Sequence, residues 1–311
     1  MTISTSDVRR DKFLENFLYA NVNRTFIADL AFTPRSVKID TGPIAGINDD
    51  HLREFDSERA LYDRSTHEMT YEYKEAGNYA IGYNDLAIFV PKRLQDQALN
   101  PFEPKRDAGI VALNAIKLKR EVLLANKLTS TAVMTQNVTL VGPDKFSDES
   151  NSNPDSVIQD AIDSVFESTG VEPNSMIISR EVFNVLKRHP FFLSMLSGIK
   201  TVDENVLMTL IKSYFNFTNV YVAKARKVTS KMGQTVTMGN VWNNDIIVYY
   251  KGEGLFEPTL GFNLSLVGHD LRSIVYPDPL RPHGGDFVEV ENAFQDLVLK
   301  PEAGYLIKGA V

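Results

Sequence analysis

The sequence predicts a mixed α+β protein, and three observations indicate this class. One long helical pattern, residues 101–129, lies alone between segments of β character. Short helices then alternate with short apolar strands over residues 151–270, which is typical of a compact α/β unit. From about residue 264 the pattern is strand only, with apolar runs separated by Gly, Pro and His.

Composition narrows the class of protein. The chain has 311 residues, 43% of them hydrophobic and 23% charged, as expected for a soluble globular protein of one large or two ordinary domains. No apolar run approaches the roughly 20 residues that span a bilayer, so we expect no membrane partner. The absence of cysteine excludes disulfides, thiolate metal sites and cysteine nucleophiles. A net charge of −7 argues against dedicated nucleic-acid binding.

The first fifty residues are predicted to form an N-terminal arm rather than a domain. Residues 11–21 fit a short amphipathic helix, and the chain beyond it is predicted to be extended. The apolar side chains of the arm are Phe13, Phe17, Leu18, Phe26, Leu30, Phe32, Val37 and Ile39. They are spaced too widely to build a core alone, so we expect them to pack on neighbouring subunits. A transient tail is the alternative.

Residues 51–98 are predicted to form a long two-stranded excursion. Met69, Tyr71 and Tyr73 alternate with polar residues, which predicts a half-exposed strand over 66–74. Residues 75–78 supply a turn, and 79–91 form the returning strand. An isolated hairpin is marginally stable in water, so this one should rest on other strands or on another subunit.

The central segment, 101–129, predicts a helix about 30 Å long. Five apolar residues recur at steps of three and four and are expected to form its buried stripe: Val111, Ala115, Leu118, Val122 and Ala125. Polar residues gather on the opposite side: Arg106, Asn114, Lys117, Arg120 and Glu121. Ile110, Leu113 and Leu124 also fall towards that side, so the helix should contact neighbours on more than one flank.

The remaining elements follow in order. A strand is predicted within 131–141, and a helix begins near 154 and ends at Gly170. A strand at 176–179, a helix at 180–188, a helix from about 201, and strands at 220–223 and 245–250 come next. Terminal strands are predicted at 264–267, 273–276, 287–290 and 297–299, before a closing segment at 301–307.

No catalytic constellation stands out in the sequence. None of the five histidines shows the i, i+4 pairing of a zinc helix, and there is no Gly-x-Ser-x-Gly elbow. Asp49, Asp50 and His51 could bind a metal, but a solvated turn accounts for them better. We therefore predict no catalytic residue, no cofactor and no metal ion.

Basic residues gather at one place, Lys224, Arg226, Lys227 and Lys231. This group could meet nucleic acid or an acidic partner. A solvated loop between strands is the simpler explanation.

The order of these segments resembles the Hong Kong 97-like fold of tailed-bacteriophage major capsid proteins. The similarity is best over residues 146–250, where Gly170–Ser179 resembles the family's glycine–proline–asparagine entry into an apolar strand. Val182–Pro190 resembles the helix that follows, and Val241–Asp245 the tryptophan turn before a strand. Lys300–Ile307 is similar to the family's terminal strand, and Arg120–Glu121 falls where the spine helix usually carries an acidic residue.

The resemblance implies a division of the chain into five parts. They are an N-terminal arm (1–50), an extended β loop or E-loop (51–98), the spine helix with the first peripheral-domain strand (99–150), an α/β axial domain (151–270) and peripheral-domain strands (271–311). It also implies a structural protein rather than an enzyme, one that assembles with itself into hexamers and pentamers. These would form the icosahedral shell of a virion around phage dsDNA, built in the host bacterial cytoplasm.

Partners follow from the same resemblance. Portal, decoration and scaffolding proteins are expected, and the scaffold should be a separate chain because no scaffolding segment of about a hundred residues is evident. Packaged DNA is expected to touch the inner face without sequence specificity. No lysine–asparagine cross-linking pair can be assigned.

Inter-subunit contacts are expected at eight residues of the arm, excursion and helix: Phe13, Phe17, Phe26, Phe32, Tyr71, Tyr73, Lys117 and Arg120. Two other functions stay open. The first is an encapsulin-type nanocompartment shell, with residues 11–21 as a cargo-docking helix. The second is a soluble α/β enzyme with an inserted domain.

Overall fold

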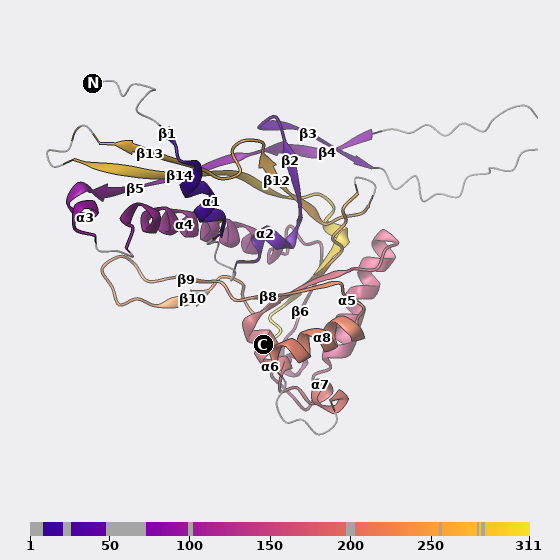
Figure 1. The fold of residues 1–311 in the computed structure, drawn as a ribbon. Coiled ribbons are helices and arrows are strands. Elements are labelled where there is room, and N and C mark those ends of the chain that lie inside the picture. Colours follow the sequence, from indigo (N-terminus) through magenta and orange to yellow (C-terminus); the bar gives the residue numbers. More distant parts are fainter. Residues whose placement is uncertain are drawn as a thin grey trace, which may run out of the picture.

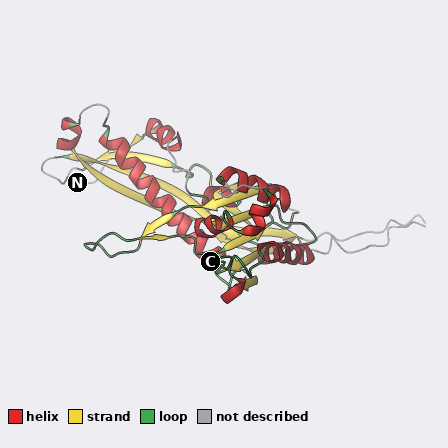
Figure 2. Ribbon diagram, turned by 90° about the horizontal axis from the view of Figure 1, so that it is seen from below, coloured by secondary structure: helices red, strands yellow, loops and turns green. Residues whose placement is uncertain are grey.

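A computed structural model describes residues 9–20, 26–47, 73–98, 102–196, 203–254, 257–278, 280 and 284–311. The described chain builds two large sheets, which lie at different ends of an elongated molecule (Figure 1), and two sheets of two strands each. Helices pack beside each large sheet, and the two-stranded pairs β3–β4 and β9–β10 extend from the body (Figures 1 and 2).

The larger sheet has six strands and is organised around β14 (Gly285–Val298), a 14-residue strand. The path through it is β1 (Arg9–Arg10), β13 (Arg272–Pro277), β14, β12 (Gly261–Leu266) and β2 (Thr33–Val37), and β5 (Gly82–Pro91) also pairs with β14. Our expectation of separate strands at 287–290 and 297–299 was wrong, because β14 runs through both. One edge of β14 pairs with β5. Its other edge pairs first with β13 and then, further along the strand, with β12. These partners keep β14 extended throughout.

The second sheet has five strands, most of them in the predicted α/β unit. Its order is β6 (Gln136–Thr139), β15 (Gly304–Lys308), β11 (Ile246–Tyr249), β7 (Ser175–Ser179) and β8 (Asn219–Ala223). Every residue of β7 and β11 is buried, as expected for central strands covered on both faces. The strands β6 and β15 come from outside the span 151–270.

Four helices accompany this sheet: α5 (Pro154–Thr169), α6 (Arg180–Leu186), α7 (Pro190–Met195) and α8 (Glu204–Tyr214). The predicted boundaries of α5 are confirmed. Proline occupies its first turn, and Gly170 ends it in the left-handed conformation at φ 73°, which only glycine adopts without cost. Short 3-10 turns at Gly142–Asp144 and Pro301–Ala303 complete the connections.

The central helix is confirmed as α4 (Pro104–Leu128), 25 residues long, with Asp107 in its first turn and Lys127 in its last, as the helix dipole favours. The predicted buried stripe is confirmed for Ala125, which is 1% exposed, and in part for Leu118 and Val122, but it is wrong for its other two members. Val111 is 59% exposed and Ala115 is also exposed, whereas Leu113 and Leu124 are buried. The reason is that the larger sheet, the arm and the second sheet contact α4 on more than one side, so burial does not follow a single stripe.

The excursion also differs from its prediction. No turn lies at 75–78, because β4 (Tyr73–Ala80) runs through those residues and leads directly into β5. The partner of β4 is β3 (Thr41–Ile47), which comes from the predicted arm and pairs antiparallel to it with one bulge. The predicted strand over 66–72 lies outside the described residues.

The arm packs on its own subunit over much of its length. Leu14 and Leu18 of α1 (Lys12–Ala20) are buried in a core cluster with α4 and the larger sheet. Ile27 and Phe32, which flank α2 (Ala28–Ala31), are buried against the end of α4 and the second sheet. The expectation that these apolar groups bury on neighbouring subunits is therefore wrong for the inward-facing ones, since their own chain already covers them.

Two smaller elements lie outside the sheets. The helix α3 (Lys92–Gln97) follows β5 and carries no buried residue. The strands β9 (Arg226–Val228) and β10 (Met238–Asn240) pair only with each other and form a hairpin that extends beneath α4 (Figure 1). Among the described helices, none is long and apolar enough to cross a membrane.

Candidate functional site

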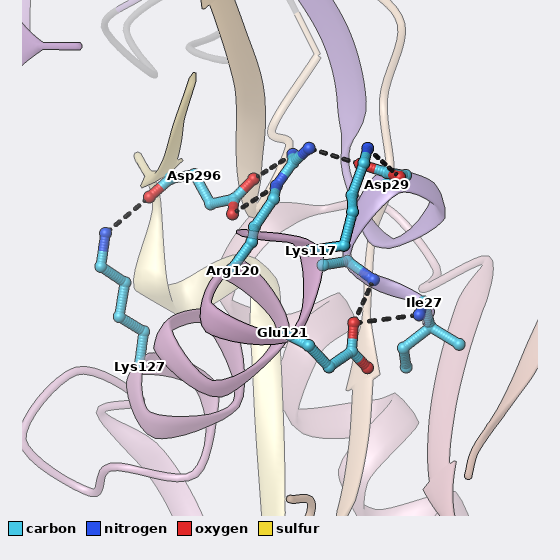
Figure 3. Close-up of polar contacts among 8 residues, drawn as sticks. Ile27, Asp29, Lys117, Arg120, Glu121, Lys127 and Asp296 are labelled. Carbon is cyan, nitrogen blue, oxygen red and sulfur yellow. Dashed lines mark hydrogen bonds and ion pairs between the residues drawn. The ribbon is translucent and has the colours of Figure 1, made fainter. Parts of the chain in front are cut away.

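A cluster of buried charged side chains lies along α4, where the arm and β14 meet the helix (Figure 3). Arg120 and Asp296 are only 3% and 5% exposed. The Arg120 guanidinium donates to both carboxylate oxygens of Asp296, from Nε to Oδ2 at 3.0 Å and from Nη2 to Oδ1 at 2.6 Å. Its third nitrogen, Nη1, pairs with Asp29 of α2. One arginine thus joins three segments that are far apart in sequence.

Neighbouring side chains extend this network. Lys117 Nζ contacts Asp29 Oδ2 at 2.6 Å, and Lys127 Nζ donates to the carbonyl oxygen of Asp296 at 2.6 Å. The Arg120 guanidinium also lies over the ring of Phe294, 4.7 Å from its centre. Burial alone would lower the pKa of Arg120, but the hydrogen bonds and charge of Asp296, with Asp29, outweigh it and raise the pKa. Arg120 therefore stays charged and paired.

Glu121, the next residue on α4, forms a second and separate junction. Its side chain is fully buried, and Oε2 accepts hydrogen bonds from the backbone N–H groups of Ile27 at 3.0 Å and Ala28 at 2.7 Å. Oε1 accepts from the indole N–H of Trp242 at 2.6 Å. Burial raises the pKa of Glu121, and these three donors only partly offset it. The carboxylate ties the start of α2 and the loop before β11 to the helix.

These contacts give the cluster a bracing role. The charges of Arg120 are matched by carboxylates, and each oxygen of Glu121 has a donor. Such groups are stable when buried because their partners replace water. The arrangement holds the arm, α4, β14 and the loop before β11 in one geometry.

Ser152 and His189 come closest to a nucleophile–base pair in the described part of the chain, with Oγ 3.0 Å from Nε2. Their hydrogen bonds give a different role. His189 Nδ1 accepts from the backbone N–H of Phe191, so Nε2 carries the proton and donates to Ser152. Ser152 Oγ in turn donates to the carbonyl of Asp148 at 2.6 Å. A general base needs a free lone pair facing the serine, and this histidine instead caps the start of α7.

Metal binding receives no support from the described residues, in which no group of three or more His, Cys, Asp or Glu side chains could hold an ion. Asp49, Asp50 and His51 lie outside the described residues. The prediction for that trio stays a prediction.

The eight residues expected at subunit contacts have different surroundings. Phe32 is 1% exposed and Arg120 3%, so neither side chain is available to another chain. Lys117 is mostly buried in its pair with Asp29, which corrects the expectation that this flank of the helix faces neighbours. The physical reason is that α2 and β14 cover this flank. Phe26 packs partly against the core.

Phe13 and Phe17 have a different environment. Phe13 is 67% exposed, and the guanidinium of Arg106 lies 4.8 Å from the ring centres of both Phe13 and Phe17. Tyr71 lies outside the described residues, and for Tyr73 only the backbone position in β4 is described. A contact with another subunit stays a prediction for these four aromatics.

Asp29, Asp296 and the role of Trp242 were not predicted from the sequence. One signal for Asp296 was present, because this carboxylate lies between Phe294 and Leu297 in a strand pattern. A charge within an apolar strand suggests a buried partner. Nothing local identified that partner as Arg120, which lies 176 residues away.

Comparisons with known proteins agree with this architecture. No protein-family model matches the sequence. A relative from Burkholderia phage BcepMu, named major capsid protein, is 25% identical over 312 residues and covers 96% of each chain. Another of the same name, from Pseudomonas phage JBD67, is 28% identical over 232 residues, covering 71% of this chain and 72% of the relative.

Solved structures share the fold. A phage-related protein from Bordetella bronchiseptica superposes with a TM-score of 0.72 at 21% identity, over 97% of both chains. The capsid protein of cyanophage P-SCSP1u gives 0.55 at 12% identity, over 91% of this chain and 88% of its own. An encapsulin from Synechococcus elongatus gives 0.50 at 11% identity, over 93% and 88%. The chain therefore has a mixed helix-and-sheet fold of the kind found in phage capsid proteins.

The relatives found by sequence indicate the class of protein more specifically than the fold does. Both are major capsid proteins of phages, which confirms the resemblance stated from the sequence. Together the relatives and the fold support a phage major capsid protein.

Proposed function

We propose that this protein is the major capsid subunit of a phage head, which assembles with itself into hexamers and pentamers of an icosahedral shell around phage dsDNA. The observation that carries the proposal is the extent of the similarity to the BcepMu major capsid protein, 96% of each chain. Similarity over that length includes the arm and the strand pairs β3–β4 and β9–β10. These are the parts that an enzyme built only on a shared core would not need.

The proposed organisation follows the Hong Kong 97-like plan. The proposed parts are the arm (1–50), the extended loop (51–98), the spine helix with a first strand (99–150), the axial domain (151–270) and the peripheral strands (271–311). The end of the axial span is an exception, because β12 pairs with β14 in the larger sheet. The pairing of β3 with β4 supports one adjustment, because it makes residues 41–47 part of the extended loop. The strands β6 and β15 belong to the second sheet although they lie outside residues 151–270. This supports a close connection between the axial and peripheral parts.

Exposed apolar side chains support assembly with other copies. Phe13, Phe102 and Val111 are 67%, 68% and 59% exposed, and all three belong to the region of α1 and α4. Burying such groups against identical subunits removes apolar surface from water. We place Phe13, Phe17, Phe26, Tyr71 and Tyr73 at subunit contacts, and withdraw Phe32, Lys117 and Arg120.

The proposal includes further partners and a location. The shell would be part of the virion and would be assembled in the host bacterial cytoplasm. A separate scaffolding chain, a portal and decoration proteins would act with it, and DNA would contact the inner face without sequence specificity.

The test is electron microscopy of the purified protein at high concentration, together with the nucleic-acid content of any particles. Closed shells that contain DNA after assembly in infected cells are expected. A chain that stays monomeric under all assembly conditions would contradict the proposal. Shells filled with an enzyme cargo would instead support the encapsulin alternative, which the fold alone leaves open because an encapsulin shares it.

A further inference from the structure

The β9–β10 hairpin is an exposed element with little support from its own chain. Its strands have three residues each and pair only with one another. The connection is ordered by bonds within the hairpin, including Thr229 N–H to the Thr237 carbonyl at 2.9 Å. A two-stranded hairpin on its own is marginally stable in water. Its structure therefore suggests that another surface covers it.

Four apolar side chains of the hairpin are unusually exposed to solvent. Val228 and Met238 lie opposite each other across the ladder, and they are 54% and 49% exposed. Val236 is 67% exposed, and Met232, near the tip, has no cover at all at 105%. Four such groups on so short an element are typical of a protein interface.

The charge of the hairpin has one sign. Between Glu204 and Asp245 the chain contains no acidic residue, and the hairpin itself carries Arg226, Lys227 and Lys231. Within the described residues, neither Lys227 nor Lys231 forms an ion pair. A partner should therefore be acidic and should also present apolar surface. A DNA backbone would meet the first requirement only.

A surface of this kind exists on the same molecule. Residues 146–179 contain no lysine or arginine, and the outer face of α5 presents Asp160, Asp163 and Glu167 to solvent. Phe166 lies among them and is 49% exposed. The face thus matches the hairpin in both respects, with opposite charge and an exposed apolar group beside the carboxylates.

The two surfaces cannot meet within one subunit. The hairpin extends beneath α4 to one side of the molecule, whereas α5 lies on the opposite side of the second sheet (Figure 1). We propose that the β9–β10 hairpin of one subunit docks on the acidic outer face of α5 of a neighbouring copy. Such a contact is head-to-tail, and head-to-tail contacts generate closed rings when the rotation closes. The inference deepens the proposed function and rests on it for the identity of the partner.

The first test reverses charge on each side. One variant carries Lys227→Glu with Lys231→Glu, and the other carries Asp160→Lys with Asp163→Lys. Each alone would face like charge, so the concentration needed for assembly should rise about tenfold. In an equimolar mixture every contact of a six-membered ring, and all but one contact of a five-membered ring, can again pair opposite charges if the two variants alternate. We expect the mixture to recover most of the assembly seen by light scattering.

A matched control separates this effect from net charge. Lys119→Glu with Lys187→Glu makes the same total change as the hairpin variant, but on α4 and between α6 and α7, and should assemble as the wild type does. Recovery in the mixture would show a contact between chains, because a contact within one chain could not be repaired by mixing. Normal assembly of either variant alone, or failure of the mixture, would overturn the proposed docking.

The second test does not depend on shell formation. The chain has no cysteine, so Met232→Cys with Phe166→Cys introduces the only two thiols. A short bismaleimide should link subunits into a ladder reaching the size of a ring, whereas either single variant should stop at dimers. A ladder without shells would support the docking and count against the proposed function. Shells without a ladder would overturn the docking and leave the function standing.

Discussion

At the residue scale, the arrangement around Arg120 shows how a buried charge is made stable. Removing a guanidinium from water is costly, and the bidentate bond to Asp296 together with the pair to Asp29 compensates for it. The compensation depends on all partners being present. Loss of one partner leaves an uncompensated charge in the interior.

The first prediction follows from this dependence. Arg120→Glu would place a third carboxylate beside Asp29 and Asp296, so we expect a loss of about 3–5 kcal/mol in the free energy of unfolding. Urea unfolding followed by circular dichroism measures it. Lys119→Glu is the matched control on the same helix, because Lys119 contacts only Asn84 at an exposed position and should change stability little. Equal stability of the two variants would contradict the bracing role of Arg120.

A second prediction concerns Glu121 and Trp242. In Glu121→Gln the amide oxygen can accept from Ile27 and Ala28, but the amide N–H₂ then faces the indole N–H, donor against donor. We expect a loss of about 1–3 kcal/mol. Trp242→Phe should cost less in the Glu121→Gln background than in the wild type, since it removes the conflict. A double-mutant cycle of urea unfolding measures the coupling, and purely additive losses would contradict it.

At the element scale, truncating a side chain should lower the free energy of unfolding by different amounts on the two sides of α4. Leu113 is 2% exposed in the cluster shared with α1 and β14, and Val111 is 59% exposed. We expect Leu113→Ala to lower the free energy of unfolding by about 2–5 kcal/mol, and Val111→Ala by less than about 0.5 kcal/mol. Thermal or urea unfolding distinguishes them. The opposite ranking would restore the stripe predicted from periodicity.

The arm gives a prediction at the same scale. Deleting residues 1–40 removes Leu18, Ile27 and Phe32 from two core clusters and leaves Glu121 without its two backbone donors. We expect the truncated chain to be unfolded or aggregated, rather than folded and merely unable to assemble. Deleting residues 1–8 alone is the control. A truncated 41–311 chain with wild-type circular dichroism and cooperative unfolding would contradict this role of the arm.

At the scale of the whole molecule, stability should be distributed unevenly. The strands β7 and β11 are buried at every residue, whereas β9 and β10 pair only with each other at the surface. Amide exchange reports the local opening free energy. In free subunits we expect the slowest exchange in β7 and β11 and fast exchange in the hairpin, and assembly should slow the hairpin selectively. Hairpin exchange that is equally slow in free subunits would contradict its need for a partner.

Several features of this protein follow from local sequence signals. They are α4 as a lone long helix, the end of α5 at Gly170, the short strands β7, β8 and β11, and the order of segments that resembles capsid proteins. These features depend on capping, glycine conformation and apolar runs. All three are specified by residues that are adjacent in the sequence.

Contacts between distant segments set which face of α4 is buried, where the arm packs, and the pairing of β3 with β4. They also make Arg120 and Glu121 interior groups, through partners at residues 29, 296 and 242. A periodic pattern describes one helix against one surface, and α4 is covered on several sides by segments distant in sequence. Burial of a charge depends on those distant partners, and no local pattern specifies them.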